Sequence, residues 1–336
     1  MSSEEKTLTA RNLRVEFGLP GGRVARAVDG VDLDVAPGEI VALAGESGCG
    51  KTTLARTLLG LERATGGTVA FDGVPLRYST RALKAYRRQV QLVLQDPTGA
   101  LNPRHTVYDA VAEGLRIHKI HDDEPGRVAE ALSRAGLRPP EQFFLAYPHE
   151  LSGGQRQRVV IAGALVLQPS LLVADEPVAS LDASVRGEIL SLLLRLKEEQ
   201  GLGSLIITHD LGLAWSIADR IAIMYLGRIV EQGPVEQVLT APRHPYTRAL
   251  VSVLPVSPAV KTSEPIVLAG ELPDASRIPG GCRFRPRCQE VASGNADAVL
   301  HQCSGEDLHI LGPEAKPHLV ACHLDRALHG DARIAV

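Results

Sequence analysis

The strongest constraint on this chain is a glycine-rich segment at residues 45–52 (GESGCGKT), which fits the pattern G-x-x-x-x-G-K-S/T. An apolar run typical of a buried strand precedes it (residues 40–44), and residues 52–59 have helical spacing, so the glycines fall on a strand-to-helix turn. Such a turn lets successive backbone N–H groups surround phosphate oxygens, and the helix N-terminus adds its positive dipole end. The pattern predicts a nucleotide phosphate loop that binds ATP.

Within this loop, Lys51 is expected to reach the β- and γ-phosphates, and the Thr52 hydroxyl is expected to ligate Mg²⁺. The alternative is a glycine-rich turn before an unrelated helix. The residues predicted to line the nucleotide are Gly45, Glu46, Ser47, Gly48, Cys49, Gly50, Lys51, Thr52 and Thr53.

Composition narrows the class of protein. The chain has 336 residues, 44% of them hydrophobic, which suggests two domains or one large domain with an appendage. Its 39 acidic residues against 36 Lys plus Arg give a net charge of −3, so nothing indicates nucleic acid as a partner. No apolar run is long enough to span a bilayer, the first residues are polar and acidic, and five cysteines do not make a secreted disulfide framework. A cytoplasmic location is expected.

Periodicity indicates an α/β core. Residues 8–17 and 26–34 alternate like strands around a glycine-rich turn, forming a small β layer before the phosphate loop. Apolar strands at residues 170–174 and 204–208 flank an amphipathic helix at 185–200, which predicts a parallel sheet with crossover helices. Residues 98–165 read as a helical insertion. We expect a nucleotide-binding domain over residues 1–240 and a small cysteine-containing domain over 241–336.

Further candidate catalytic residues follow apolar strands. Asp175 and Glu176 come directly after the strand at 170–174, where open α/β sheets place their ligands. Asp175 would hold Mg²⁺ through water, and Glu176 would act as general base on the attacking water. Gln95 could contact Mg²⁺ and that water, and His209 could donate to the γ-phosphate. The alternatives are a solvated acidic turn and a loop histidine without a ligand.

A second glycine-rich turn, Leu151-Ser152-Gly153-Gly154-Gln155, and the triplet Ser180-Leu181-Asp182 complete an ordered set of motifs. In this order the chain resembles the ATP-binding subunits of ATP-binding-cassette (ABC) transporters. The resemblance implies a RecA-like core, an antiparallel β subdomain and a helical subdomain. It also implies two cassettes packed head to tail, with Ser152, Gly153, Gly154 and Gln155 facing the partner's ATP and Asp182 communicating across the interface. Phe17 is the candidate for stacking on adenine; a buried core phenylalanine is the alternative.

A narrower resemblance covers almost the whole chain. It is similar to the dipeptide/oligopeptide and nickel importer branch in the segments QDP and LNPR (95–97 and 101–104), YPHE (147–150), MYLGRIVE (224–231), HPYTRAL (244–250) and GCRFRPRC (281–288). Thr98-Gly99-Ala100 and Leu181 depart from the usual pattern. The resemblance implies an ATPase that powers import of di- or oligopeptides, bound to the inner face of the cell membrane. Its partners would be an identical or sister cassette, two permease subunits that dock near residues 96–110, and indirectly an external solute-binding protein.

Other functions stay open at this stage. A nickel or other small-solute importer ATPase would carry the same motifs. A soluble ABC ATPase acting on nucleic acid or ribosomes would be expected to have paired cassettes or a basic surface, and a degenerate cassette would lack the catalytic residues that this chain retains.

Four late cysteines, Cys282, Cys288, Cys303 and Cys322, could hold a [4Fe-4S] cluster or Zn²⁺, or could be unliganded. Arginines 283, 285 and 287 would offset the charge of an anionic cluster. Spacing alone does not choose the metal; the resemblance to the peptide-importer branch favours the cluster.

Overall fold

The computed structural model describes residues 6–179, 181–254, 265–310, 318–329 and 334–335. Contacts divide the chain into two compact units built from separate stretches of sequence. The first unit comprises residues 1–8, 35–40 and 71–207, and the second comprises 9–34, 41–70 and 208–336. The predicted boundary at residue 240 stays a prediction. Within the described residues, no helix combines the length and hydrophobicity needed to cross a membrane.

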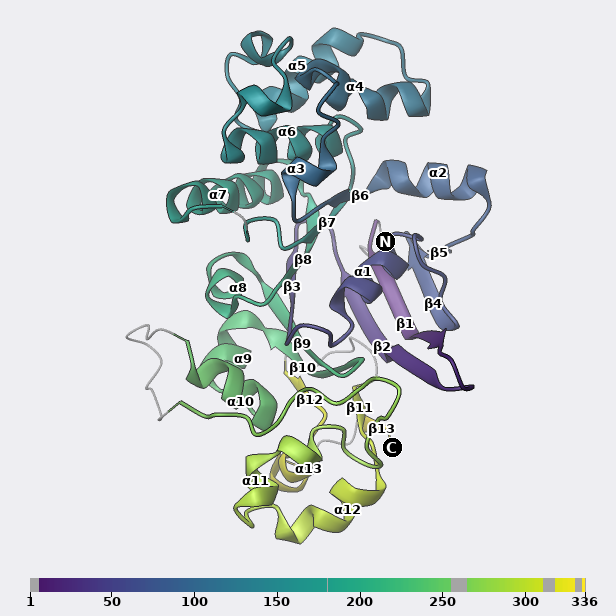
Figure 1. The fold of residues 1–336 in the computed structure, drawn as a ribbon, viewed down its shortest axis with the longest axis vertical. Coiled ribbons are helices and arrows are strands. Elements are labelled where there is room, and N and C mark those ends of the chain that lie inside the picture. Colours follow the sequence, from purple (N-terminus) through teal and green to yellow (C-terminus); the bar gives the residue numbers. More distant parts are fainter. Residues whose placement is uncertain (1–5, 180, 255–264, 311–317, 330–333, 336) are drawn as a thin grey trace, which may run out of the picture. The chain divides into compact units, whose positions relative to one another are not determined.

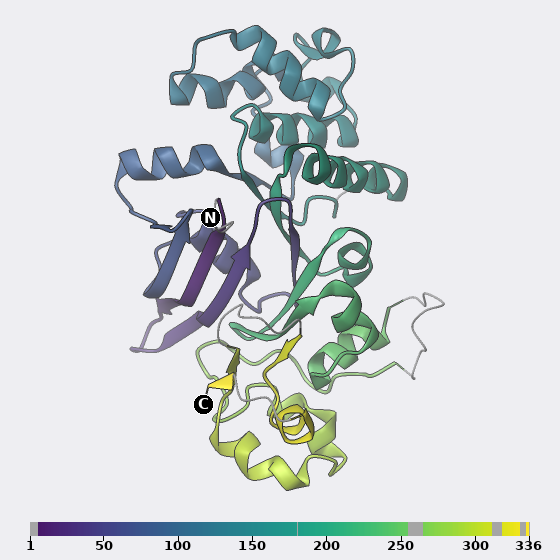
Figure 2. The same cartoon turned by 180° about the vertical axis from the view of Figure 1, so that it is seen from behind.

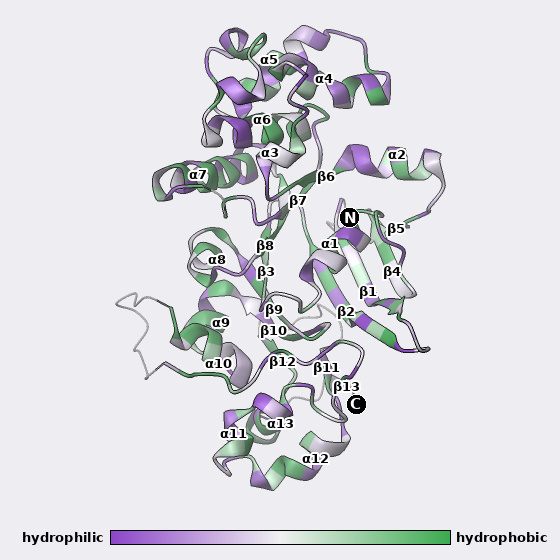
Figure 3. Ribbon diagram, in the orientation of Figure 1, coloured by the Kyte–Doolittle hydropathy of each residue, from purple (hydrophilic) through white to green (hydrophobic). Residues whose placement is uncertain are grey.

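The first unit holds a parallel sheet whose strands run in the order β8–β7–β6: β6 (Val90–Val93), β7 (Leu171–Asp175) and β8 (Gly203–Thr208). Helix α7 (Ala183–Gln200) connects β7 to β8 as a crossover, as predicted. It buries Ile189, Leu192, Leu193 and Leu196, one stripe at helical spacing, and Figure 3 shows its hydrophobic and hydrophilic residues side by side. The predicted α/β architecture is confirmed in this unit.

Helices dominate the stretch between β6 and β7, as predicted for residues 98–165. Helices α4 and α5 each pack against α6, and the three lie together in Figure 1. Short strand β5 (Val74–Pro75) also belongs to this unit. Helix α2 (Thr80–Gln89) precedes β6. The helices between β6 and β7 are α3 (Pro97–Ala100), α4 (Val107–His118), α5 (Glu124–Arg134), the 3₁₀ turns η1 (Pro140–Phe143) and η2 (Pro148–Glu150), and α6 (Gly153–Leu165).

Among its described residues, the second unit contains three sheets, of which one is the short antiparallel pair β11 (His309–Ile310) and β13 (Ile334–Ala335). In another, β3 (Ile40–Ala44) pairs in parallel with β9 (Arg220–Tyr225), β9 pairs antiparallel with β10 (Arg228–Pro234), and β10 pairs with β12 (Leu319–Val320). The third runs in the order β2–β1–β4 and is drawn in purple and blue in Figure 2: β1 (Leu8–Gly18), β2 (Val24–Val35) and β4 (Gly66–Phe71). The strands predicted at residues 8–17 and 26–34 are thus confirmed. The helices of this unit before residue 254 are α1 (Lys51–Leu58), α8 (Leu211–Ile217), α9 (Val235–Thr240) and α10 (Pro245–Ser252).

The described residues from 265 onward form short elements that pack on the rest of the second unit. Phe284 lies 5.2 Å from Tyr225 on β9 and 5.4 Å from Tyr246 on α10, ring centre to ring centre, and all three rings are fully buried. The structure does not confirm a separate domain after residue 240. The elements are η3 (Arg285–Arg287), α11 (Gln289–Ala292), η4 (Asp297–Val299), α12 (Leu300–Gly305), β11 (His309–Ile310), α13 (His323–His329) and β13 (Ile334–Ala335).

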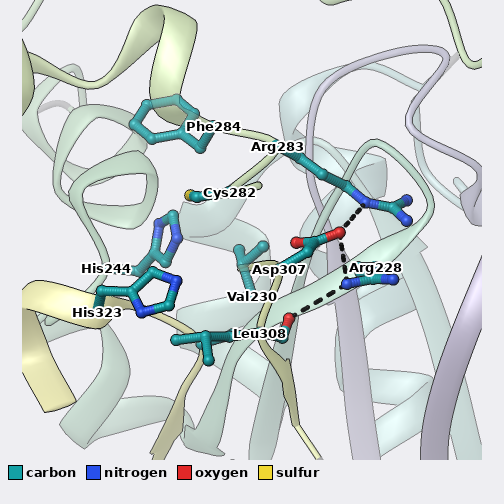
Figure 4. A pocket seen from close by; sticks show the side chains of 10 residues that line it. Arg228, Val230, His244, Cys282, Arg283, Phe284, Asp307, Leu308 and His323 are labelled. Carbon is teal, nitrogen blue, oxygen red and sulfur yellow. Dashed lines mark hydrogen bonds and ion pairs between the residues drawn. The ribbon is translucent and has the colours of Figure 1, made fainter. Parts of the chain in front are cut away.

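Buried charges also tie this C-terminal segment to the second unit. The Arg283 side chain is 3% exposed; its guanidinium pairs with Asp29, with Asp307 at 3.0 Å, and donates to the carbonyl oxygen of Leu226 at 2.6 Å. Arg228 reaches Asp307 at 2.6 Å, and Figure 4 shows this carboxylate between the two arginines. Burial alone would raise the pKa of Asp29, but the hydrogen bond and charge of Arg283, with the charge of Arg228, hold it below its usual range.

We expect Arg283→Met to destabilise the second unit by about 3 kcal/mol, because it leaves two carboxylates short of a buried counter-charge. The pKa of Asp29 is depressed in the folded chain, so the stability it contributes is present above the unfolded pKa of about 3.9 and is lost as the pH falls further. The difference between wild type and Arg283→Met in thermal unfolding should therefore shrink below about pH 4. Arg11→Met, which removes the Arg11–Asp34 pair, whose arginine is 41% exposed, is the control and should cost under about 1 kcal/mol.

Candidate functional site

The predicted phosphate loop has the expected context, between buried strand β3 and helix α1. Gly50 precedes the helix with φ of 110°, and a Cβ there would lie 2.1 Å from the carbonyl oxygen of Ala27, so only glycine fits. The Lys51 side chain lies within the loop, where its ammonium donates to the carbonyl oxygens of Gly45 at 2.7 Å and Glu46 at 2.9 Å. The loop is therefore built around one buried positive charge.

The other loop residues differ in exposure. Ser47, Gly48 and Thr52 are exposed, whereas Glu46 and Thr53 are half-buried. Cys49 is 1% exposed, and burial raises the pKa of its thiol. Its side chain therefore faces the protein interior and acts as a small packing residue in the loop.

In the first unit, the structure brings Gln95 and Glu176 together. Val93 of β6 is paired with Ala174 of β7, so the residues that follow these parallel strands emerge at the same edge of the sheet. The amide nitrogen of Gln95 donates to the Glu176 carboxylate at 3.1 Å. Glu176 directly follows Asp175, the last residue of β7, which is half-buried.

Glu176 has an unusual backbone. Its φ is 46°, in the left-handed region that costs a residue other than glycine about 1 kcal/mol or more. Its N–H donates to the carbonyl oxygen of Ile207 on β8 at 2.9 Å, which helps to hold this conformation. Strain of this kind at a proposed general base is typical of functional sites.

The signature turn forms the start of helix α6. The Ser152 hydroxyl accepts from the N–H of Gln155 at 3.2 Å, and the Gln155 side chain accepts from the N–H of Ser152 at 2.8 Å, a reciprocal cap. Ser152 is exposed, Gly153 is half-buried and Gly154 is buried. A Cβ at Gly154 would lie 2.5 Å from Cγ1 of Val185, so the first turns of α6 and α7 meet at this glycine.

Asp182 begins helix α7. Its carboxylate accepts from the N–H of Val185 at 3.1 Å and from the Ser184 hydroxyl at 2.9 Å, and these bonds lower its pKa. It is exposed, as a residue at a subunit interface would be in the isolated chain. Ser180 of the same motif lies outside the described residues.

Phe17 and His209 belong to the second unit. Phe17, on β1, is 38% exposed, so the alternative of a buried core phenylalanine is wrong. His209 follows β8 and is exposed. Their roles toward adenine and the γ-phosphate stay predictions.

Oxygen donors suited to Mg²⁺ are present at the predicted positions: the Thr52 hydroxyl, the Asp175 carboxylate and the Gln95 amide. Because the Gln95 nitrogen donates to Glu176, its amide oxygen is the atom it would offer to the metal. Among the described residues, no three or more His, Cys, Asp or Glu side chains are grouped closely enough to hold one metal ion.

The four late cysteines, which are free thiols, all line one cavity in the second unit, with a volume of about 20 Å³. The N–H of Cys282 donates to the carbonyl oxygen of Cys303 at 2.9 Å, which joins two of the segments. Burial raises the pKa of Cys282 and of Cys322 to about 12, and the other thiols nearby add to this effect. The fourth member, Cys288, also has a raised pKa because of burial.

The arginines around these cysteines behave differently from the sequence-based expectation. Of the three, only Arg285 lines the cysteine cavity. Arg283 pairs with Asp29 and Asp307, and Arg287 pairs with Glu46 of the phosphate loop at 2.7 Å. The expectation that Arg283 and Arg287 offset a cluster charge is wrong, because both are already neutralised by carboxylates.

Sequence reasoning also missed the contacts between Glu46 and the C-terminal part of the chain. Arg287 lies 241 residues from its partner, and Tyr246, whose hydroxyl accepts from the N–H of Glu46 at 2.9 Å, lies 200 residues away. Neither contact leaves a local spacing pattern in the sequence. The only available signal was that the loop carries a glutamate, Glu46, that needs a positively charged partner.

Comparison with known proteins agrees with this geometry. Residues 28–179 match the model of the ABC transporter family, and residues 230–294 match the C-terminal region of oligopeptide/dipeptide transporters. The chain is 42% identical to the putative oligopeptide transport ATP-binding protein YkfD of Bacillus subtilis, over 95% of both chains. It is 38% identical to the oligopeptide transport ATP-binding protein AppF of the same organism, over 96% of this chain and 98% of AppF.

A solved structure has a similar fold. The dimeric post-hydrolysis ABC cassette MJ0796, bound to ADP and phosphate, matches with a TM-score of 0.61 and 29% identity over 68% of this chain and 98% of that one. The chain therefore belongs to the ATP-binding subunits of ABC transporters, in the group that carries the oligopeptide/dipeptide C-terminal region. Proteins of this class are ATPases coupled to transport.

Proposed function

We propose that this protein hydrolyses ATP at the phosphate loop, with Glu176 as general base, and so powers import of di- or oligopeptides. The Gln95–Glu176 hydrogen bond of 3.1 Å at the end of two parallel strands carries the catalytic assignment. The Lys51 ammonium at the centre of the phosphate loop supports the binding assignment, because it is placed to attract phosphate oxygens.

In the proposed reaction, Glu176 accepts a proton from water while the water oxygen forms a bond to the γ-phosphorus. The bond from that phosphorus to the β-phosphate oxygen breaks, giving ADP and phosphate. Gln95 orients the water and the carboxylate, and His209 donates a hydrogen bond to the γ-phosphate. Bound Mg²⁺, with Thr52, Asp175 and Gln95 as its protein ligands, would offset phosphate charge.

The proposal includes a second cassette. The exposed Ser152 hydroxyl and the N-terminal N–H groups of α6 are donors suited to a γ-phosphate held by a partner chain. ATP would then join two cassettes, and hydrolysis would release them. The related cassette MJ0796 is dimeric in its solved structure, which supports a dimer of cassettes here.

The peptide cargo rests on the relatives. YkfD and AppF both bear the name oligopeptide transport ATP-binding protein, and the C-terminal region of this chain matches the same transporters. We therefore propose that the chain binds two permease subunits at the inner face of the cell membrane, near residues 96–110. An external solute-binding protein would deliver the peptide to those permeases.

A second proposal concerns the late cysteines: they hold a [4Fe-4S] cluster. Convergence of four thiols from distant segments on one cavity supports it. Among the described residues, no three candidate ligands are grouped closely enough to hold a metal ion in the present arrangement, so the cysteine side chains would have to be rearranged for either a cluster or zinc. The cavity of about 20 Å³ has the size of one water, so side chains would move outward around the cluster.

We expect Glu176→Gln to retain ATP binding but to lose at least about 100-fold in turnover, because the water has no proton acceptor. Size-exclusion chromatography with MgATP should show a trapped dimer. Lys51→Ala is the matched control and should lose ATP affinity instead of turnover. Undiminished hydrolysis by Glu176→Gln would remove the general-base assignment.

Anaerobic purification tests the cluster proposal. The protein should be brown, absorb in the visible range and contain about four iron atoms per chain with matching sulfide. Cys288→Ser should lose most of this iron, whereas Cys49→Ser, which changes a thiol of the phosphate loop, should keep it. One zinc per chain, or no metal at all, would contradict the proposal.

A further inference from the structure

Glu46 is the point at which the phosphate loop meets the C-terminal part of the second unit. Its backbone carbonyl accepts from the Lys51 ammonium at 2.9 Å, and its N–H donates to the Tyr246 hydroxyl at 2.9 Å. Its carboxylate forms a two-point ion pair with the Arg287 guanidinium, at 2.7 and 3.1 Å. The backbone carbonyl also accepts from the N–H of Cys49 at 3.3 Å. Every polar group of this residue is thus engaged, and two of its four partners, Tyr246 and Arg287, come from the C-terminal stretch.

Arg287 is held firmly in this position. Its side chain is 7% exposed, against 28% for Glu46. Its Nε donates to the carbonyl oxygen of Ala269 at 3.2 Å, and its guanidinium lies 5.9 Å from the centre of the Tyr225 ring. That ring packs on Tyr246 at 4.8 Å, so the two residues that contact Glu46 share one aromatic support.

The charge at Glu46 matters for an ATP site. A carboxylate in a loop that cradles a triphosphate repels the ligand, and a neighbouring guanidinium cancels that repulsion. A planar arginine fork also restricts the carboxylate and the backbone of its residue, because both hydrogen bonds must be kept together. The ion pair therefore neutralises the Glu46 carboxylate and also restrains the conformation of the loop.

We propose that Arg287 is a positioning residue for ATP binding: it neutralises Glu46 and fixes the phosphate loop from the C-terminal segment. This inference rests on the proposed function of the loop as the ATP site. Tyr246 supports the same residue through its backbone. The C-terminal segment is, on this account, part of the nucleotide site, although it follows the loop by more than 200 residues.

The test is a double-mutant cycle in the full-length protein, with MgATP as the ligand. Arg287→Met should raise the KM for ATP about fivefold to tenfold, as expected for one uncompensated charge near the phosphates, and should change kcat less than about twofold. In a Glu46→Gln background, the same substitution should raise KM by less than about twofold, because no repelling carboxylate remains. Arg287→Lys should lie between wild type and Arg287→Met, since it keeps the charge but not the fork.

The matched control is Arg248→Met. It removes another Arg–Glu pair of the same unit, Arg248–Glu290 at 3.2 Å, that does not involve Glu46. It should leave the KM for ATP within about twofold of wild type. Thermal unfolding of every variant separates loss of affinity from loss of folding, and Arg287→Lys keeps the test valid if Arg287→Met does not fold.

Two results would overturn the inference. One is an unchanged KM in Arg287→Met while Lys51→Ala loses ATP binding; the loop would then be the ATP site without needing Arg287. The other is an equal rise in KM for Arg287→Met with and without Glu46→Gln, which would show a packing effect in place of charge neutralisation. If Lys51→Ala also bound ATP normally, the proposed function of the loop would itself be wrong.

Discussion

The shape of the phosphate loop depends on close backbone approach. At Gly50 a single added carbon would meet the carbonyl oxygen of Ala27 at 2.1 Å, so helix α1 can start where it does only because the side chain is absent. The start of α1 in turn places Lys51 inside the loop, within hydrogen-bonding distance of two loop carbonyls. The position of the Lys51 ammonium therefore depends on the absence of a side chain at Gly50.

Charge in the second unit is balanced through contacts that span the sequence. Arg283 pairs with Asp29 and with Asp307, and Arg287 pairs with Glu46. The pairs with Asp29 and Glu46 join the C-terminal segment to N-terminal elements. Buried ions of this kind are expensive when one partner is missing, so they favour a single way of packing the segment. The aromatic group of Tyr225, Tyr246 and Phe284 adds the apolar contact that the same arrangement needs.

Local patterns in the sequence were enough to predict most of the elements. The strand at 40–44, the helix after the phosphate loop and the crossover helix near 185–200 all follow from apolar spacing and glycine placement, because these signals act over a few residues. The pairing of Gln95 with Glu176 could be anticipated as well, since both follow apolar strands of one parallel sheet.

Contacts between residues far apart in the chain could not be predicted from the sequence. Arginines 283 and 287 lie between two cysteines, which suggested a role beside a metal cluster, but Arg283 pairs with Asp29 and Arg287 with Glu46, both far away along the chain. No periodicity encodes a contact across 241 residues. Whether Phe17 is buried also depends on which strand edge it occupies, and only the folded sheet reveals that it is exposed.

The contact between Gly154 and Val185 restricts which residues the two positions can accept. The signature serine and Asp182 each cap a helix, and the first turns of those helices touch at this glycine with no room for a methyl group. A larger residue at position 154 therefore requires a smaller side chain at position 185. Residues separated by thirty-one places must vary as a pair, although neither has a side chain that performs chemistry.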